Sequence, residues 1–507
     1  MEFFLGIDIG SSSVKVSLVE AETGKTLATA QSPSSEMKMD APQVGWAEQD
    51  PEMWWSELKN AMRFLSEKLK VKSEKLPNSL FTFHSSLFTI KAIGISYQMH
   101  GLILVDKDQK VLRPSIIWCD SRAVEIGDRA FKKLGKNYCL ENYLNSPGNF
   151  TASKLRWVIE NEPHIWEKTD KMMLPGDFIA MRLTGEACTT VSGLSEGILW
   201  DFKNKSIAKR LERNYGFGDN VVSKIVPTFG EQGFVNAWAA AELGLKEGTP
   251  VTYRAGDQPN NAFSLNVLNV GEVAATAGTS GVIYGVTNKS DYDVQSRVNT
   301  FVHVNNSHEE TRNGVLLCIN GTGIANAWLR RTTGGMSYDA MNTEATKVSV
   351  GSEGIIMLPF GNGSERIFNN KQIGGQIYGL DFNRHSQGHL FRAAQEGIVF
   401  SLNYGLEIMK TVGVEAKNIK AGHANMFLSP LFREIFANTT GATIELFDTD
   451  GATGAARGAG IGVSYYKNFK EAFNGLKKIT TIEPNKKLQE RYAETYQKWL
   501  GVLERNL

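Results

Sequence analysis

Two short segments of the same kind, far apart in the chain, constrain the fold most. Each consists of a β-rich run, a tip of glycine and hydroxyl residues, and a second β-rich run. The first spans Phe3 to Val19 with the tip G-S-S-S, and the second spans Glu272 to Val286 with the tip G-T-S. The two tips begin 268 residues apart (278 − 10). This spacing predicts two domains of similar architecture, each of which begins with a strand hairpin.

The composition of both tips is typical of loops that bind phosphate. Glycine allows backbone N–H groups to approach an anion closely, and serine or threonine hydroxyls add further donors. Asp8 and Lys15 flank the first tip. Taken by itself, the first tip is more simply interpreted as an ordinary polar hairpin turn. The pair, however, favours two loops that hold a polyphosphate from both sides.

Length and composition agree with two domains and a small ligand. A chain of 507 residues with 42% hydrophobic residues can fill two cores of ordinary size. Its 55 basic and 54 acidic residues leave a net charge of +1, which gives no reason to expect nucleic acid or an anionic membrane as the main partner.

Cysteine usage and hydropathy indicate the compartment. The four cysteines form no C-x-x-C pair, which argues against a zinc ribbon or a disulfide framework. The N-terminus lacks a basic segment before an apolar run, and no apolar run is long enough to span a membrane. We therefore expect a soluble, cytoplasmic protein.

A strand-to-helix turn in the middle of the chain is the strongest candidate for chemistry. Val251 to Arg254 is predicted to be a buried strand and Asn261 onward an apolar helix, so Asp257 lies on the turn between them, where α/β proteins place functional groups. The structural alternative is that Asp257 is a helix N-cap that accepts a backbone N–H from the first turn. A second candidate follows the predicted strand Ile90 to Ser96, where Gln98 and His100 interrupt two otherwise buried strands.

Several further elements are predicted along the chain. Helices are expected after Asp50–Pro51, from Lys154, after Pro175, at 390–409, at 451–460 and at 486–505, whereas 72–89 is expected to be an irregular insertion. The polar cluster at 189–197 is interpreted as a surface loop, although it is polar enough to line a cleft. The linker at 244–250 suggests a boundary that divides the chain into domains 1–250 and 251–507.

A series of motifs, in order along nearly the whole chain, resembles the FGGY family of carbohydrate kinases. The matching segments are G-I-D-I-G-S-S-S-V-K at Gly6, G-W-A-E-Q-D-P at Gly45, Q-M-H-G at Gln98, W-C-D-S-R at Trp118, G-D-Q at Gly256, A-G-T-S-G at Ala277 and S-E-R at Ser364. The resemblance implies an α/β fold of two actin-like (ribonuclease H-like) ATPase domains. Each would be a mixed five-stranded sheet flanked by helices, with ATP and sugar meeting in a cleft between the domains.

The resemblance also implies roles for individual residues. Asp257 would be the catalytic base, and Asp8 would position Mg²⁺ through water. The expected contacts are Gln98, Met99, His100, Asp257 and Gln258 with the sugar, and Ser11, Ser12, Lys15, Thr279, Gly323, Gly422 and Asn425 with ATP. The chain departs from the family pattern at Ser11, where threonine is commoner, and at Gln395, Ala421 and His423, which puts nucleotide affinity in question.

The expected reaction is ATP-dependent phosphorylation of D-xylulose at its 5-hydroxyl, because Met99 and His100 match the pair that family members acting on this sugar use. Phosphoryl transfer needs in-line positioning and neutralisation of phosphate charge, which backbone amides, Lys15 and Mg²⁺ can supply. The nearest alternative is a kinase for ribulose, fuculose, gluconate or a polyol. A non-catalytic sugar or nucleotide sensor is the alternative from another class. The expected partners are a small sugar and ATP, without nucleic acid or membrane. The sequence is compatible with a homodimer.

Overall fold

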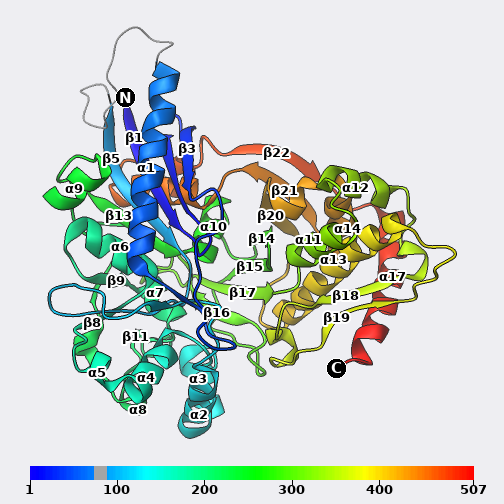
Figure 1. Ribbon diagram of the computed structural model, residues 1–507, viewed down its shortest axis with the longest axis horizontal. Coiled ribbons are helices and arrows are strands. Elements are labelled where there is room, and N and C mark those ends of the chain that lie inside the picture. Colours follow the sequence, from blue (N-terminus) through cyan, green and yellow to red (C-terminus); the bar gives the residue numbers. More distant parts are fainter. Residues whose placement is uncertain (74–87) are drawn as a thin grey trace. The chain divides into compact units, whose positions relative to one another are not determined.

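The computed structural model describes residues 1–73 and 88–507 and divides the chain into two compact units (Figure 1). Unit 1 comprises Met1–Asn266, Phe301–Asn306 and Thr449–Leu476, and unit 2 comprises Val267–Thr300, Ser307–Asp448 and Lys477–Leu507. The first division along the chain therefore falls after Asn266 and not after Pro250, because the strand that follows Pro250 pairs within unit 1. Most of the predicted insertion at 72–89 lies outside the described residues.

Unit 1 is built on a mixed five-stranded sheet in the order β13-β5-β1-β2-β3, as expected. Its strands are β1 (Glu2–Ile9), β2 (Val14–Glu20), β3 (Thr26–Ser32), β5 (Thr89–Tyr97) and β13 (Val251–Gly256). β1, β2 and β3 form an antiparallel meander, whereas β5 and β13 run parallel to β1. The predicted first hairpin is confirmed, with Ile9 paired to Val14 across its tip.

The two faces of this sheet are covered differently. Alternate residues of β1, from Phe3 to Ile9, pack in one hydrophobic core with Trp54 and Leu58 of α1 (Pro51–Ser73). On the opposite face, α15 (Gly451–Gly462) lies so close that a Cβ on Gly6 would collide with its backbone. The small-residue helix predicted at 451–460 is therefore confirmed, and it belongs to unit 1. Asp8 shares its face of β1 with Gly6, so its side chain points toward α15.

The remaining elements of unit 1 surround this sheet. They are β4 (Glu48–Gln49), β6 (Ile103–Val105), β7 (Ser115–Ile116), α2 (Val124–Leu134), α3 (Lys136–Tyr143), α4 (Thr151–Asn161), α5 (Pro163–Trp166), β8 (Lys171–Met173), α6 (Pro175–Thr184), β9 (Cys188–Thr190), α7 (Val191–Glu196), β10 (Trp200–Asp201), β11 (Ser206–Ile207), α8 (Lys209–Tyr215), η1 (Asp219–Val221), β12 (Lys224–Val226), α9 (Ala237–Leu243), α10 (Asp257–Ser264) and α16 (Phe469–Ala472). The cluster at 189–197 is a buried strand and helix, so its interpretation as a surface loop is wrong. Its polar side chains are tolerated in the interior because they find partners there, as when the Thr190 hydroxyl caps α7.

Unit 2 repeats the strand order of unit 1 and extends it. Its sheet has seven strands, not five, in the order β16-β17-β15-β14-β20-β21-β22. They are β14 (Val273–Ala277), β15 (Gly281–Thr287), β16 (Asn299–Val302), β17 (Asn313–Ile319), β20 (Asn418–Gly422), β21 (Thr443–Asp448) and β22 (Lys477–Ile482). The antiparallel meander β14-β15-β17 and the parallel strands β20 and β21 match β1-β2-β3, β5 and β13. The predicted internal repeat is therefore confirmed, and the two extra strands lie at the sheet edges.

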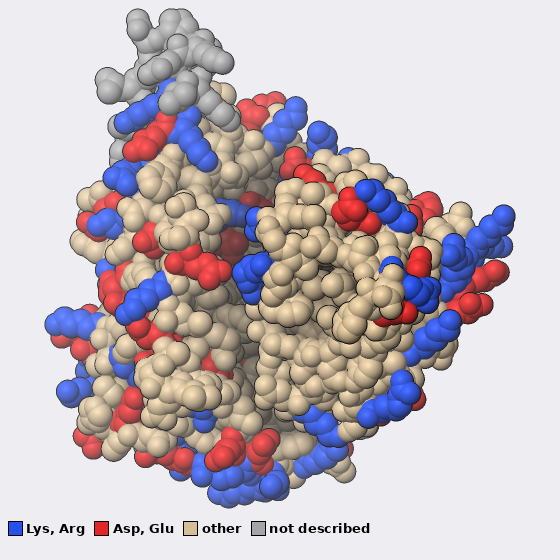
Figure 2. All heavy atoms as spheres, turned by 45° about the vertical axis from the view of Figure 1, so that its right-hand side comes forward, with Lys and Arg blue, Asp and Glu red and all other residues tan. Residues whose placement is uncertain are grey.

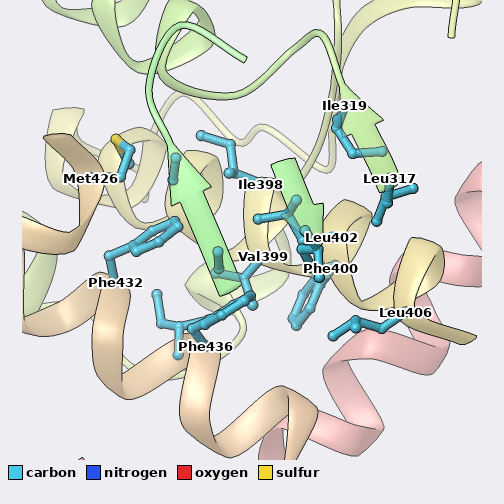
Figure 3. Packing of buried hydrophobic residues seen from close by; sticks show 14 of the residues in the cluster. Leu317, Ile319, Ile398, Val399, Phe400, Leu402, Leu406, Met426, Phe432 and Phe436 are labelled. Atoms are coloured by element: carbon cyan, nitrogen blue, oxygen red, sulfur yellow. The ribbon is translucent and has the colours of Figure 1, made fainter. Parts of the chain in front are cut away.

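Helices bury one face of this second sheet. Figure 3 shows side chains of α13 (Gln387–Thr411) next to the strands and to α14 (Pro430–Thr440). Phe432 and Phe436 of α14 stack with their ring centroids 6.0 Å apart. Full burial of a large apolar side chain contributes about 1.5–3 kcal/mol, so this continuous core is the main source of the unit's stability. Its further elements are α11 (Gly323–Thr332), α12 (Tyr338–Thr346), η2 (Ser352–Gly354), β18 (Ile356–Phe360), η3 (Arg366–Phe368), β19 (Gly374–Tyr378), η4 (Asn425–Leu428) and α17 (Lys486–Glu504).

Surface charge and cysteines agree with the composition. On the face shown in Figure 2, basic and acidic side chains are interspersed. All four cysteines are free thiols. Among the residues with described positions, no helix is both long and apolar enough to cross a membrane.

Candidate active site

Three parallel strands of unit 1 end in register, and this places the predicted catalytic residues at one edge of the sheet. Ile9 pairs with Tyr97 of β5, and Tyr97 pairs with Gly256 of β13. The next residues along the chain are the glycine of the first tip, Gln98 and Asp257. Residues that are far apart in sequence therefore meet because three strands stop at the same level.

A pocket of about 290 Å³ opens at this edge. It is lined by Asp8, Gly10, Ser11, Ser12, Ser13, Lys15, Gln31, Gln98, Trp118 and Asp257. Most of the unit-1 residues predicted to act in catalysis, in metal positioning and in phosphate binding thus face one space. Met99 and Gln258 directly follow lining residues in the chain, and His100 lies two positions after Gln98.

Asp257 is the first residue of α10, and the helix N-cap is Gly256. The N-cap interpretation of Asp257 is therefore wrong, because a capping side chain must precede the first helical residue. The surrounding protein atoms desolvate the carboxylate and raise its pKa to about 7, and the negative charge of Asp8 adds to the shift. Gln258 opposes the shift by donating from Nε2 to Asp257 Oδ2 at 3.2 Å. The carboxyl group consequently exchanges a proton near neutral pH, as a general base should.

Asp8 lies between a lysine and the first turn of α15. Burial raises the pKa of its carboxyl group, the Ser96 hydroxyl and the Lys15 ammonium lower it, and the charge of Asp450 raises it again. Lys15 forms an ion pair with Asp450 at 3.4 Å. A Cβ on Gly451 would collide with the Asp8 carboxylate, so a larger residue here would displace that group. An acidic and a basic group therefore lie side by side at the first tip.

Gln49 connects the first tip to the strand ends, although no sequence pattern marked it as functional. Its Nε2 donates to the carbonyl of Ser11 at 2.7 Å. Its Oε1 accepts from Trp54 Nε1 at 3.1 Å and from Gln98 Nε2 at 3.2 Å. The side chain is 1% exposed, so these bonds form in the interior, where they fix geometry strongly. The motif G-W-A-E-Q-D-P was the available signal, but no pattern indicated which of its residues reaches the tip.

His100 is held in an unusual backbone conformation beside the strand end. Its φ is +63°, in the left-handed region that residues with a side chain rarely occupy. Its ring packs edge-on against Phe150, with centroids 4.9 Å apart, and lies 5.4 Å from the ring of Phe301. Its carbonyl accepts a hydrogen bond from Lys154 Nζ at 2.9 Å. Several elements therefore determine where this imidazole points.

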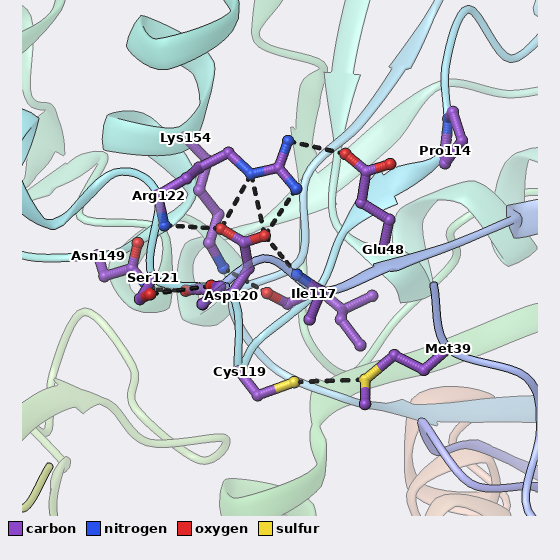
Figure 4. Close-up of polar contacts among 12 residues, drawn as sticks. Met39, Glu48, Pro114, Ile117, Cys119, Asp120, Ser121, Arg122, Asn149 and Lys154 are labelled. Atoms are coloured by element: carbon purple, nitrogen blue, oxygen red, sulfur yellow. Dashed lines mark hydrogen bonds and ion pairs between the residues drawn. The ribbon is translucent and has the colours of Figure 1, made fainter. Parts of the chain in front are cut away.

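A buried ionic network supports the loop that carries Trp118 (Figure 4). The Arg122 guanidinium contacts both the Asp120 carboxylate and Glu48 at 2.7 Å. Lys154 is fully buried and also donates to the Ile117 carbonyl at 2.8 Å. Burial lowers the pKa of Lys154 to about 8, and the charge of Asp120 opposes this shift. The motif W-C-D-S-R is therefore mainly structural, although Trp118 Nε1 donates to Ser11 Oγ at 3.3 Å.

The predicted nucleotide residues of unit 2 form a second group. The Gly323 amide, which begins α11, donates to the Gly278 carbonyl at 2.9 Å. The Asn425 side chain lies beside Gly278, because its Nδ2 is 3.5 Å from the position that a Cβ on this glycine would take. The second tip, the start of α11 and Asn425 thus lie together within this unit. Gly422 is the last residue of β20.

The structure places three of the departures from the family pattern. Gln395 is buried, donates to Asn342 Oδ1 and accepts from Ser429 Oγ, both at 3.0 Å, so its polar atoms are satisfied in the core. Ala421 is buried within β20, where it pairs with Ala275. His423 directly follows β20, and its amide donates to the Phe447 carbonyl at 2.9 Å.

The donor set fits a magnesium ion held largely by substrate and water. The described residues contain no group of three or more His, Cys, Asp or Glu side chains that could hold a metal by themselves. Mg²⁺ does not need such a cage, because it typically uses one or two carboxylates together with waters and substrate phosphates. Asp8 in the pocket beside the first tip is a suitable carboxylate.

Comparison with known proteins identifies both halves of the chain. The model of the FGGY family of carbohydrate kinases, N-terminal domain, matches residues 3–264, and the model of the C-terminal domain of the same family matches residues 273–462. The two matches lie on either side of the division at Asn266.

Individual relatives agree with these matches. The chain is 29% identical to a xylulose kinase of Lactococcus lactis, with 99% of this chain and 96% of the relative covered. It is 28% identical to a xylulose kinase of Escherichia coli, with 90% and 88% covered. A crystal structure of a protein described as a xyloylose kinase from Brucella ovis has a TM-score of 0.85 at 26% identity and covers 99% of this chain and 98% of that one.

Proposed function

The chain belongs to the FGGY family of carbohydrate kinases, and we propose that within this family it phosphorylates D-xylulose at its 5-hydroxyl with ATP. The observation that carries the proposal is the pocket of unit 1, where Asp257, Asp8, Lys15 and the first tip face the same space. The relatives that are xylulose kinases support the choice of sugar.

Asp257 is the base in this proposal. As the sugar oxygen bonds to the γ-phosphorus, the bond from that phosphorus to the β–γ bridging oxygen breaks, and ADP leaves. The proton of the sugar hydroxyl passes to the Asp257 carboxylate. An aspartate suffices because the hydroxyl loses its proton late in a loose transition state. A pKa of about 7 makes the carboxylate more basic than an ordinary one.

The acceptor sugar would be held by Gln98, Met99, His100 and Gln258. Gln98 is 3% exposed and lines the pocket, and its Oε1 has no hydrogen-bond partner among the described residues. Gln258 Oε1 is likewise buried without one. Unpaired amide oxygens are suitable acceptors for sugar hydroxyls, because a bound sugar would satisfy them.

The phosphates would be held by backbone amides of the first tip together with Ser11, Ser12 and Lys15, and in unit 2 by Thr279 and Gly323. Gly422 and Asn425 of unit 2 would hold the adenosine. Asp8 would hold Mg²⁺ through water. When bound, this ion neutralises phosphate charge and helps to align the transferred group. The ion pair of Lys15 with Asp450 keeps the lysine oriented at the first tip.

A panel of acceptors tests the proposal. The protein is mixed with Mg·ATP and with D-xylulose, ribulose, fuculose, gluconate or a polyol, and ADP release is followed. We expect the highest kcat/KM with D-xylulose. Strong turnover on another acceptor with none on D-xylulose would reject the sugar but keep the kinase. No turnover on any of them would favour the non-catalytic sensor.

A further inference from the structure

Glu196 is a buried carboxyl group directly beneath the turn that carries Asp257. It is the last residue of α7 and is 1% exposed. A Cβ on Gly256 would lie 2.6 Å from Glu196 Oε2 and 2.6 Å from Met99 Cγ. Glu196 and Met99 therefore fill the space beside Gly256, and a larger residue before Asp257 would displace one of these side chains.

The main chain of Glu196 also orients His100. The carbonyl of Glu196 lies 2.9 Å from His100 Nδ1. A carbonyl oxygen can only accept, so Nδ1 carries the hydrogen of this bond, which fixes the orientation of the ring. Glu196 thus contacts both the turn that carries the predicted base, Asp257, and the predicted sugar-binding residue His100.

The helix that carries Glu196 is firmly anchored. Ser192 Oγ donates to the Val302 carbonyl at 3.1 Å, and Ser195 Oγ accepts from the Val302 amide at 2.9 Å. These bonds bring the segment 301–306 into unit 1 and place Phe301 against the His100 ring. The position of Glu196 is therefore fixed independently of its own side chain.

The surroundings of the carboxyl group favour its neutral form. Neither of its oxygens has a partner that meets hydrogen-bond geometry within the described part of the chain. The groups that face it are the hydroxyl of Tyr97 and the acids Asp257 and Asp177, the latter paired with buried Arg254 at 3.1 Å. Burial, followed by the charges of Asp257 and Asp177, raises the pKa of Glu196 well above its usual range, and Tyr97 opposes this. An unpaired ionised carboxylate here would be very costly.

We propose that Glu196 is a positioning residue of the acceptor site, which supports the Gly256–Asp257 turn and His100 from beneath as a neutral carboxylic acid. The inference rests on the proposed function, because it assigns the supported residues to sugar binding and proton removal. A neutral acid fills the space without adding a second negative charge beside the base. An ionised one would disfavour the carboxylate form of Asp257 that the reaction needs.

Three variants separate the shape of Glu196 from its charge. Glu196→Gln keeps the size and is always neutral, and we expect its kcat/KM for the sugar to stay within about threefold of the wild type. Glu196→Ala and Glu196→Asp withdraw the group from Gly256, and we expect both to lose at least about tenfold in kcat/KM for the sugar, because small misplacements of reacting groups are costly. The KM for ATP should be unchanged.

Glu212 on α8 provides the matched control, because it is equally buried at 1% exposure and lies outside the pocket lining. Glu212→Ala should lower the unfolding temperature without changing the KM for the sugar. Equal kinetic effects of Glu196→Ala and Glu212→Ala would overturn the positioning role. An equal loss of kcat/KM for the sugar in Glu196→Gln and Glu196→Ala would overturn the claim that Glu196 acts as a neutral carboxylic acid.

An infrared measurement tests the protonation state without turnover, even if an alanine variant fails to fold. The wild-type-minus-Glu196→Gln difference spectrum at pH 7 should contain a protonated-carboxyl carbonyl band. Carboxylate bands in its place would overturn the proposal. If the wild type prefers another acceptor, the kinetics are run with that acceptor. Absence of turnover with D-xylulose thus rejects the proposed substrate. The infrared spectrum tests the proposal for Glu196 separately.

Discussion

Replacing Gln49 by leucine should weaken both the fold of unit 1 and the phosphate tip. Leucine fills similar volume but cannot hydrogen-bond, so Trp54 Nε1 and Gln98 Nε2 lose their bonds to Gln49 Oε1. Both residues are buried, at 0% and 3% exposure. An orphaned buried polar group costs about 1–3 kcal/mol, so the two together should lower the free energy of unfolding by about 2–6 kcal/mol. That is large beside a typical total of about 5–15 kcal/mol.

Function should change as well, because Gln49 Nε2 holds the Ser11 carbonyl at 2.7 Å. We expect the KM for ATP to rise about tenfold or more. Loss of this hydrogen bond would allow the first tip to move, and its backbone amides would then no longer be placed to bind phosphate. Urea-dependent proteolysis measures stability, and coupled ADP release measures the kinetics. Gln497→Leu, at an exposed position of α17, is the control and should change neither. A stability loss below about 1 kcal/mol with an unchanged KM for ATP would refute the assigned role of Gln49.

Three further changes probe other parts of the site. Lys154→Met removes the ammonium that donates to the His100 carbonyl. Steady-state kinetics should then show a KM for the sugar that is about tenfold higher and a KM for ATP that is unchanged. Equal changes in the two KM values would contradict this role of Lys154. Gly323→Ala places a Cβ against the Gly278 carbonyl, so the Kd for ATP, measured by calorimetry, should rise while the Kd for the sugar stays constant. The rate should fall as pH decreases through about 7, because Asp257 acts as a carboxylate and its pKa is about 7; a rate that is flat from pH 5 to 8 would exclude it as the titrating base.

The sequence predicted the repeated parts of the molecule well, because they depend on local patterns. Both hairpins, the strand before Asp257 and the helix at 451–460 follow from β-rich runs, glycine tips and small-residue spacing. The candidate base and the first tip were predicted from local turns together with the family resemblance, and the register of three strand ends brings them together.

What the sequence did not reveal depends on contacts between distant residues. Glu196 was missed because a polar stretch resembles a surface loop unless one knows that β9 and α7 lie beneath the Asp257 turn. Gln49 was missed because its four hydrogen-bond partners, Ser11, Lys38, Trp54 and Gln98, are spread along the chain. Thr449–Leu476 likewise belongs to unit 1 because α15 packs against β1. No local sequence pattern predicts this packing.

Asp257→Asn tests the central claim most directly. The amide keeps the shape of the side chain but cannot accept a proton, so kcat should fall at least about a thousandfold, within the range typical of general-base removal. The Kd values for D-xylulose and Mg·ATP, measured by calorimetry, should change less than about threefold, because Asp257 is assigned to proton removal.

The same variant should be more stable than the wild type at pH 8. The folded-state pKa of Asp257 is raised to about 7 from an unfolded value near 3.9, so the carboxylate costs stability that grows as pH rises through this interval. The advantage of Asn should therefore shrink as pH falls toward 4. A kcat of Asp257→Asn within tenfold of the wild type would contradict the assignment of Asp257 as the base.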